Sequence, residues 1–220
     1  MKAAACRFAL LAHPGSRRAL GFSAACAKEG FPEPRLIAWE DWLSPAFDRA
    51  AALAGIDALR IETPAENLAA ERTLLLLGAS ASRKEGSLFL PEHECPVLPP
   101  DEGELRYQRQ WYLGWRTVLE ELDEISRTTG IRMMNAPAEI ASLFDKQATR
   151  EILQRDGVPL PPSSGICSSF EDLLATMQST GWNRVFLKPC HGSSATGVMA
   201  IARSSKGAWQ VVCRLGGDLS

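Results

Sequence analysis

The amino-acid sequence predicts an α/β fold, in which a Rossmann-like N-terminal domain (residues 1–130) precedes a small α+β subdomain (residues 131–220). In the first half, short apolar runs alternate with helical patterns, which is typical of βαβ units. After Gly130 new helix caps and turn signals begin, and the last third contains a strand, a Gly/Ser loop and a hairpin pattern. With 45% hydrophobic residues the chain can bury a core, which excludes disorder over most of its length.

The N-terminal half begins with a short apolar run, Cys6–Ala12, that predicts a buried parallel strand. Ser16 can cap the helix that follows, and Gly30 ends it. A strand is then expected at Arg35–Trp39 and a helix at Ala50–Ala54. A short extended segment is expected at Leu59–Ile61 and a buried strand at Thr73–Gly78. This alternation predicts a Rossmann-like layer.

The clearest helical pattern starts after Pro99-Pro100, where Asp101 and Glu104 resemble a capping box. Apolar side chains recur at helical spacing up to about Thr128: Leu105, Trp111, Trp115, Val118, Leu122 and Ile125. The aromatic residues Trp111, Tyr112 and Trp115 could line a substrate pocket. A stripe that faces the core is the favoured interpretation.

The second part opens with a short helix at Asn135-Ala136-Pro137, because proline suits a first helical turn. Asp145 can cap the next helix, which Asp156-Gly157 ends. A helix is then expected at Phe170–Gln178 and a strand at Val185–Pro189. Two further strands, Val198–Ala202 and Trp209–Arg214, are expected to form a hairpin.

The overall charge is close to neutral, since 24 Lys and Arg oppose 26 Asp and Glu. This balance argues against a basic nucleic-acid-binding surface. No apolar run approaches the roughly 18 residues of a transmembrane helix, and the N-terminal run is too short for a signal peptide. The six cysteines are dispersed and contain no Cys-x-x-Cys pair, which favours free thiols. We therefore expect a cytoplasmic protein with no nucleic-acid or membrane partner.

The segment from Lys188 to Val198 carries the most informative chemistry: a lysine ends a buried strand, a loop rich in Gly, Ser and Thr follows, and a second strand begins. Small residues let backbone N–H groups approach an anion, and the lysine supplies positive charge for phosphate oxygens. The loop is not a Walker A motif, because Val198 follows Gly197 where that motif has lysine, and a strand comes next. By itself the loop could also be a plain hairpin turn.

Upstream, Asp145-Lys146 begins a helix that carries Thr149 and Leu153 and leads to Gly157-Val158-Pro159-Leu160-Pro161. Together with Asn135-Ala136-Pro137, Leu187-Lys188-Pro189 and the loop Gly192–Val198, this arrangement resembles the ATP-grasp superfamily. The resemblance covers residues 131–213 by motif. It extends to residues 1–130 by the order of the elements only.

The resemblance implies a pre-ATP-grasp domain of Rossmann-like fold, then the small ATP-grasp subdomain, with ATP bound next to the latter. The matching lysines, Lys146 and Lys188, would reach the ATP phosphates, and the loop would close over them. The implied ATP-binding residues are therefore Lys146, Lys188, His191, Gly192, Ser193, Ser194, Thr196 and Gly197. Most members activate a carboxylate as an acyl-phosphate, which an amine or thiol then attacks, so ATP, magnesium and a small-molecule carboxylate are the expected ligands.

One departure from the family concerns the metal. Asp218 is the only acidic residue after the loop, so no metal ligand is assigned and no catalytic residue is named. We expect the ligands of magnesium in a C-terminal subdomain that this chain lacks, and expect the chain to be an incomplete fragment that is inactive alone. The alternative is a nucleotide-binding or interaction module that keeps the fold without catalysis; a Rossmann-like protein for another phosphorylated ligand is a third hypothesis.

Three other groups of residues have less support. His93, Glu94 and Cys95 share one loop, but no second ligand cluster stands at zinc spacing. Cys190 and His191 are neighbours whose side chains are expected to point in opposite directions. Arg17 and Arg18 follow the first strand, where they could meet an anionic substrate, but solvated arginines are the favoured interpretation.

Overall fold

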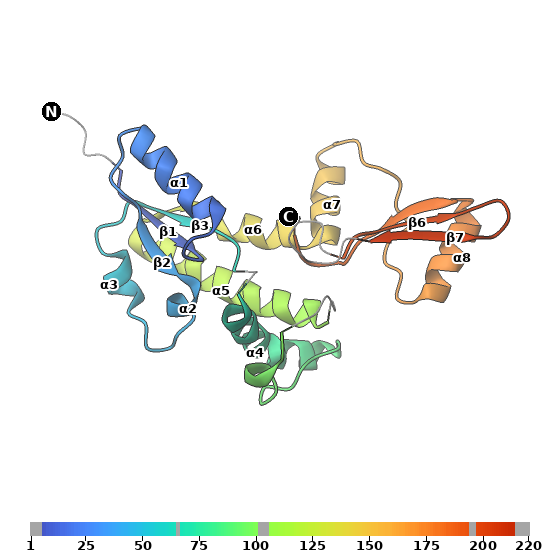
Figure 1. Cartoon of the computed structure of the whole chain (residues 1–220), viewed down its shortest axis with the longest axis horizontal. Coiled ribbons are helices and arrows are strands. Elements are labelled where there is room, and N and C mark those ends of the chain that lie inside the picture. Colours follow the sequence, from blue (N-terminus) through green and yellow to red (C-terminus); the bar gives the residue numbers. More distant parts are fainter. Residues whose placement is uncertain (1–5, 65–66, 101–105, 194–196, 214–220) are drawn as a thin grey trace. The chain divides into compact units, whose positions relative to one another are not determined.

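A computed structural model describes residues 6–64, 67–100, 106–193 and 197–213 (Figure 1). The chain divides into two compact units. The first comprises residues 1–100 and 109–141, and the second comprises residues 101–108 and 142–220. One unit contains a parallel sheet and the other an antiparallel sheet, which confirms the α/β class that the sequence predicts.

The first unit is built on a parallel sheet in the order β2-β1-β3-β4. Its strands are β1 (Phe8–Ala12), β2 (Arg35–Ala38), β3 (Ala58–Ile61) and β4 (Arg132–Met134). Successive side chains of a strand point to opposite faces of the sheet, yet all four residues from Ala9 to Ala12 are buried. The central strand is therefore covered on both faces, which explains its continuous apolar run.

The helices of the first half begin where the sequence indicates a cap. In α1 (Arg17–Lys28), the Ser16 side chain accepts a hydrogen bond from the amide of Ala19. This helix covers one face of β1, since Ala19 packs with Leu10 and Ala12. Two short helices follow β2, namely α2 (Trp39–Trp42) and α3 (Arg49–Leu53); the sequence analysis predicts only the second.

The prediction of a buried strand at Thr73–Gly78 is wrong, because this run lies inside α4 (Leu68–Glu85). Leu74 and Leu75 are buried, whereas Leu76 and Leu77 are 39% and 42% exposed, as expected of a helix with one covered face. Asn67 caps the N-terminus and Gly86 ends the helix with a left-handed conformation. A short apolar run is compatible with either a strand or a helix. Here the run belongs to a longer segment with a cap at each end, and that segment forms a helix.

Helix α5 (Gln108–Thr129) forms where the periodicity predicts it, and Tyr112 and Trp115 are buried, as the core interpretation requires. The expected capping residues Asp101 and Glu104, and also Leu105, lie outside the described residues. The fully buried Gln110 accepts from the amide of Leu90 and donates to the carbonyl oxygens of Leu75 and Leu90. This amide joins α5 to α4 and to the segment that leads into the 3₁₀ turn η1 (Cys95–Val97).

Strand β4 has no counterpart among the predicted elements. It pairs in parallel with β3, and the register places Met133 opposite Leu59. The domain boundary expected between residues 130 and 131 therefore falls just before a strand of the first sheet, and the first unit continues to Ala141. The strand is only three residues long, too short to give a periodic signal.

The larger segment of the second unit begins within α6 (Pro137–Phe144) and continues with α7 (Lys146–Arg155) and α8 (Phe170–Thr180). Its sheet has the order β5-β6-β7, with antiparallel strands β5 (Arg184–Leu187), β6 (Met199–Arg203) and β7 (Trp209–Cys213). The predicted hairpin is therefore confirmed. Helix α8 packs on one face of the sheet, where Leu173 and Met177 form a small core with Ile201 (Figure 1).

All six cysteines lie within the described residues and are free thiols, in accord with the sequence analysis. Among the described helices, none combines the length and apolar character that crossing a membrane requires.

Candidate functional site

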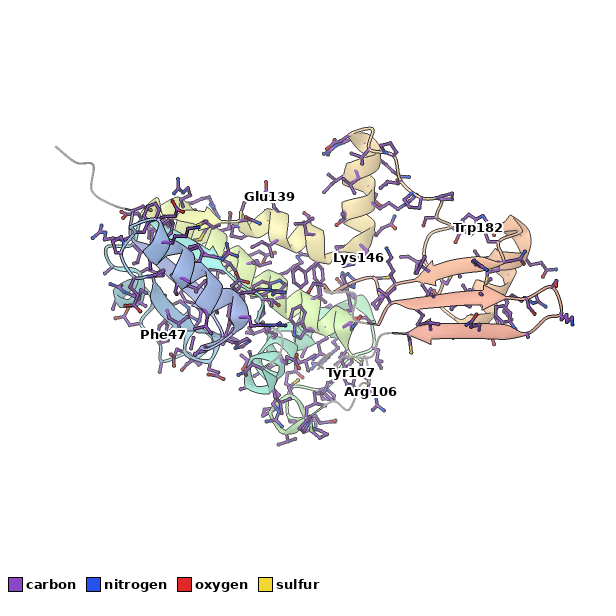
Figure 2. All side chains as sticks on the ribbon, turned by 45° about the horizontal axis from the view of Figure 1, so that its top comes forward. Phe47, Arg106, Tyr107, Glu139, Lys146 and Trp182 are labelled. Carbon is purple, nitrogen blue, oxygen red and sulfur yellow. The ribbon has the colours of Figure 1, made fainter. Side chains whose placement is uncertain are left out.

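The candidate site of the second unit starts at the first turn of α7, where Figure 2 labels Lys146. Asp145 is the N-cap of this helix, and its Oδ1 accepts hydrogen bonds from the amides of Gln147 and Ala148, both at 3.0 Å. Capping of this kind satisfies amides that have no partner within a helix. The cap therefore holds the backbone of Lys146 in a defined conformation at the start of α7.

The segment that follows β5 returns alongside this turn. The amide of Lys146 donates to the carbonyl oxygen of Cys190 at 2.9 Å, and the amide of Gly192 donates to that of Phe144 at 3.0 Å. These two bonds form an isolated antiparallel bridge between Asp145 and His191. The bridge joins Asp145-Lys146 to the segment directly after Lys188-Pro189, and the two lysines, 42 residues apart in the chain, lie in one unit.

Gly192 begins the loop with a φ of 121°, a conformation that other residues rarely adopt. Its carbonyl oxygen accepts a hydrogen bond from the ammonium group of Lys146. An ammonium group has three donors, and this contact uses one of them. The lysine is thus positioned on the loop and keeps donor capacity for an anion.

Burial lowers the pKa of Lys146, the positive charge of Lys188 lowers it further, and Asp145 opposes the shift. The positive charge of Lys188, at the end of β5, therefore acts on the ammonium group at the start of α7. Such a pair attracts an anion, since a negative charge between like charges removes their repulsion. The electrostatics fit a phosphate-binding site.

Lys188 follows β5 on the face of the sheet that points away from α8. Val185 and Leu187 pack against the α8 core, so the alternation of side chains directs Phe186 and Lys188 to the opposite face. Phe186 is 75% exposed there, and its cross-strand neighbour Ala200 is paired in turn with Val212, which is 60% exposed. An open apolar surface therefore lies on the same sheet face as the lysine.

Contacts of side chain and backbone bring together the predicted residues Lys146, His191 and Gly192. The positive charge of Lys188 acts on Lys146. Ser193 is exposed at the loop, and Gly197 is buried beside β6. The predicted residues Ser194 and Thr196 lie outside the described residues. Asp145 is predicted only as a helix cap. Its side-chain contact with His191 is not predicted, because the pairing of two distant segments leaves no local signal in the sequence.

Magnesium is the metal that the resemblance implies, and it prefers carboxylate oxygens. Over the described residues, no group of three or more His, Cys, Asp or Glu side chains converges. Asp145 is occupied by the cap and by His191. The residues of the described site therefore do not fit a protein-built magnesium site, and no chemical step is assigned to the metal.

The other candidate groups do not form a site in the structure. His93 lies 3.7 Å from Glu94 on the surface, whereas the neighbouring Cys95 is buried and its thiol donates to the carbonyl oxygen of Pro91. Arg18 lies 3.9 Å from the carboxylate of Glu62, which Arg60 also contacts at 2.6 Å. Arg18 thus pairs with an acidic side chain of the same unit.

No family model matches the chain, and no curated protein matches it. Among solved structures, this chain is similar to one described as "Structure of ATP-grasp ligase PsnB complexed with precursor peptide PsnA2 and AMPPNP". The alignment covers 93% of this chain and 75% of that chain, with 11% sequence identity and a TM-score of 0.46.

Proposed function

We propose that this chain is an ATP-grasp protein of ligase type and that its second unit binds the phosphates of ATP. One observation carries the proposal: Lys146 and Lys188 come from separate elements, and the start of the Gly/Ser loop lies against the first of them. Phosphoryl transfer depends mainly on positioning and on neutralising charge, which two lysines and backbone donors can supply.

The phosphate site in this proposal comprises Lys146, Lys188 and the loop residues His191, Gly192, Ser193, Ser194, Thr196 and Gly197. The base of the nucleotide would lie on the open sheet face at Phe186, since aromatic and apolar side chains favour contact with a purine ring. The first unit would be the Rossmann-like pre-ATP-grasp domain and the second the small ATP-grasp subdomain. The parallel order β2-β1-β3-β4 supports the first assignment.

The reaction in this proposal has two steps. A carboxylate oxygen of a small-molecule substrate attacks the γ-phosphorus of ATP, the bond to the bridging oxygen of ADP breaks, and an acyl-phosphate forms. An amine or thiol then attacks the acyl carbon, phosphate leaves, and loss of a proton gives the amide or thioester. Lys146 and Lys188 bind and orient the phosphates, and their charge stabilises the negative charge of the transferring group.

Substitution of either lysine tests the nucleotide site. We expect Lys188→Ala and Lys146→Met to raise the Kd for MgATP about tenfold or more, as loss of a charge-assisted contact does. Lys206→Ala is the matched control, because Lys206 is an exposed lysine in the turn between β6 and β7 of the same unit. Calorimetric titration gives the affinities, and an unchanged Kd in Lys188→Ala would refute the phosphate role.

Stability adds a second measurement for Lys146. Burial and Lys188 disfavour the charged form of Lys146, and this cost offsets its hydrogen bond to Gly192. We therefore expect Lys146→Met to lose nucleotide affinity with little change in the melting temperature. Thermal shifts with ATP, NAD and sugar nucleotides then test selectivity, because a ligand of the folded state raises the melting temperature. ADP formation that requires both a carboxylate and an amine or thiol distinguishes a ligase from a nucleotide-binding module.

A further inference from the structure

Two short segments pair around the start of the loop. Asp145 and His191 are directly opposite each other, and the flanking bonds run from the amide of Lys146 to Cys190 and from the amide of Gly192 to Phe144. This is the antiparallel arrangement in which the opposed residues do not bond to each other's backbone and their side chains approach most closely. The backbone therefore forces the side chains of Asp145 and His191 together.

The two side chains lie next to each other in this position. The Nε2 atom of His191 lies 3.6 Å from Oδ2 of Asp145, and the two side chains are only 12% and 23% exposed. The other carboxylate oxygen of Asp145, Oδ1, accepts the two amides at the start of α7. One carboxylate thus binds the helix through one oxygen and the loop through the other.

Lys146, the first residue of α7, adds a second contact to the loop. Its ammonium group donates to the carbonyl oxygen of Gly192. The start of the loop is therefore held by contacts with both Asp145 and Lys146.

We infer that His191 is a positioning residue, which acts through Asp145 to hold the start of the phosphate loop against the first turn of α7. In this role its imidazole binds the helix cap, and Lys146 and Gly192 contact the phosphates. The inference deepens the proposed function and rests on it for the identity of the ligand. The pairing itself can be tested without a nucleotide.

Amide hydrogen exchange tests the pairing directly. In His191→Leu, which removes the donor, we expect exchange of the Gly192 and Lys146 amides to become about fivefold faster, because a partly buried pair is lost. In His191→Gln, whose Nε2 has a similar reach, exchange should stay within twofold of the original protein. Asp145→Asn keeps a good capping oxygen but loses the charge. Adding His191→Leu to it should have little further effect, because the pair is already broken.

Affinity for MgATP and for tripolyphosphate gives the second measurement. We expect His191→Leu to weaken both by about fivefold and His191→Gln to restore them. His93→Leu, at an exposed histidine of the first unit, is the control and should leave both affinities unchanged.

The outcomes separate the two proposals. Weaker phosphate binding in His191→Leu with unchanged amide exchange would mean that the imidazole contacts the phosphate itself, and the positioning role would be wrong. Unchanged exchange and unchanged affinity would also overturn it. If exchange responds as expected while Lys188→Ala does not alter nucleotide binding, the pairing stands and the proposed function fails.

Discussion

Gly78 and Gly114 show at the residue scale how closely α4 and α5 approach. A Cβ atom on Gly78 would lie 1.9 Å from the carbonyl oxygen of Gln110, and one on Gly114 would lie 1.9 Å from that of Leu74. Each glycine thus faces the backbone of the other helix, and no flexible side chain can move aside. The contact also brings Gln110 within hydrogen-bonding distance of Leu75 and Leu90.

Substitution of Gly78 by alanine should therefore force the two helices apart. We expect Gly78→Ala to lower the free energy of unfolding by about 2–4 kcal/mol, as overpacking against a rigid neighbour does. The control is Gly21→Ala in α1, where a Cβ meets nothing within 4 Å; it should raise stability by about 0.5–1 kcal/mol through helix propensity. Urea denaturation measures both, and equal effects of the two substitutions would contradict the close contact.

At the scale of elements, the starts of β1 and β3 are joined by one pair of residues. The amide of Arg7 donates to the carboxylate of Asp57 at 2.8 Å, and the amide of Asp57 donates to the carbonyl oxygen of Arg7 at 2.9 Å. The guanidinium group adds a further hydrogen bond at 3.2 Å. Hydrogen bonds from the side chain and then the backbone of Arg7 lower the pKa of Asp57 below its ordinary 3.8.

This shift gives the pairing a defined pH dependence. A carboxylate whose pKa is lowered by folding stabilises the protein above the unfolded value, and that contribution is lost as the pH falls through the lower, folded value. We expect the original protein to be more stable than Asp57→Asn at pH 7, with the difference shrinking below pH 3.8. Glu33→Gln, at an exposed loop position, is the control. An Asp57 carboxyl that titrates by NMR at or above 3.8 would refute the pairing.

At the scale of the whole molecule, the two units differ in how much they bury. The first has buried residues on every strand except β4 and on its helices, both short and long, among them Trp39, Leu59, Leu74 and Trp115. Among the described residues of the second unit, the core consists of three buried side chains, Leu173, Met177 and Ile201, and α7 has no buried residue. Since burial of apolar surface is the main source of stability, the second unit should be the less stable one.

Hydrogen exchange measured by mass spectrometry tests this difference. We expect peptides from β5, β6 and β7 to exchange about tenfold or more faster than peptides from β1 and β3, because local opening costs less where few apolar side chains are buried. Saturating MgATP should slow exchange in the second unit if it binds there. Equal protection of the two sheets would show that their stability is not set by these separate cores.

Local signals in the sequence predict much of this structure. Ser16 and Asp145 cap the helices that they were expected to cap, and the hairpin of β6 and β7 forms as its turn indicates. Such features depend on residues within a few positions of one another. The run Thr73–Gly78 is predicted wrongly because its leucines suit either a strand or a helix. The residues against which it packs lie on α5, far along the chain.

By itself, the sequence determined the α/β class, most of the element boundaries and the two lysines of the candidate site. Tertiary structure alone decided that α4 is a helix that crosses α5 at two glycines, that β4 belongs to the first sheet, and that Asp145 meets His191. The reason is physical: caps and periodicity act over a few residues, whereas each of these contacts joins segments whose proximity exists only once the chain has folded.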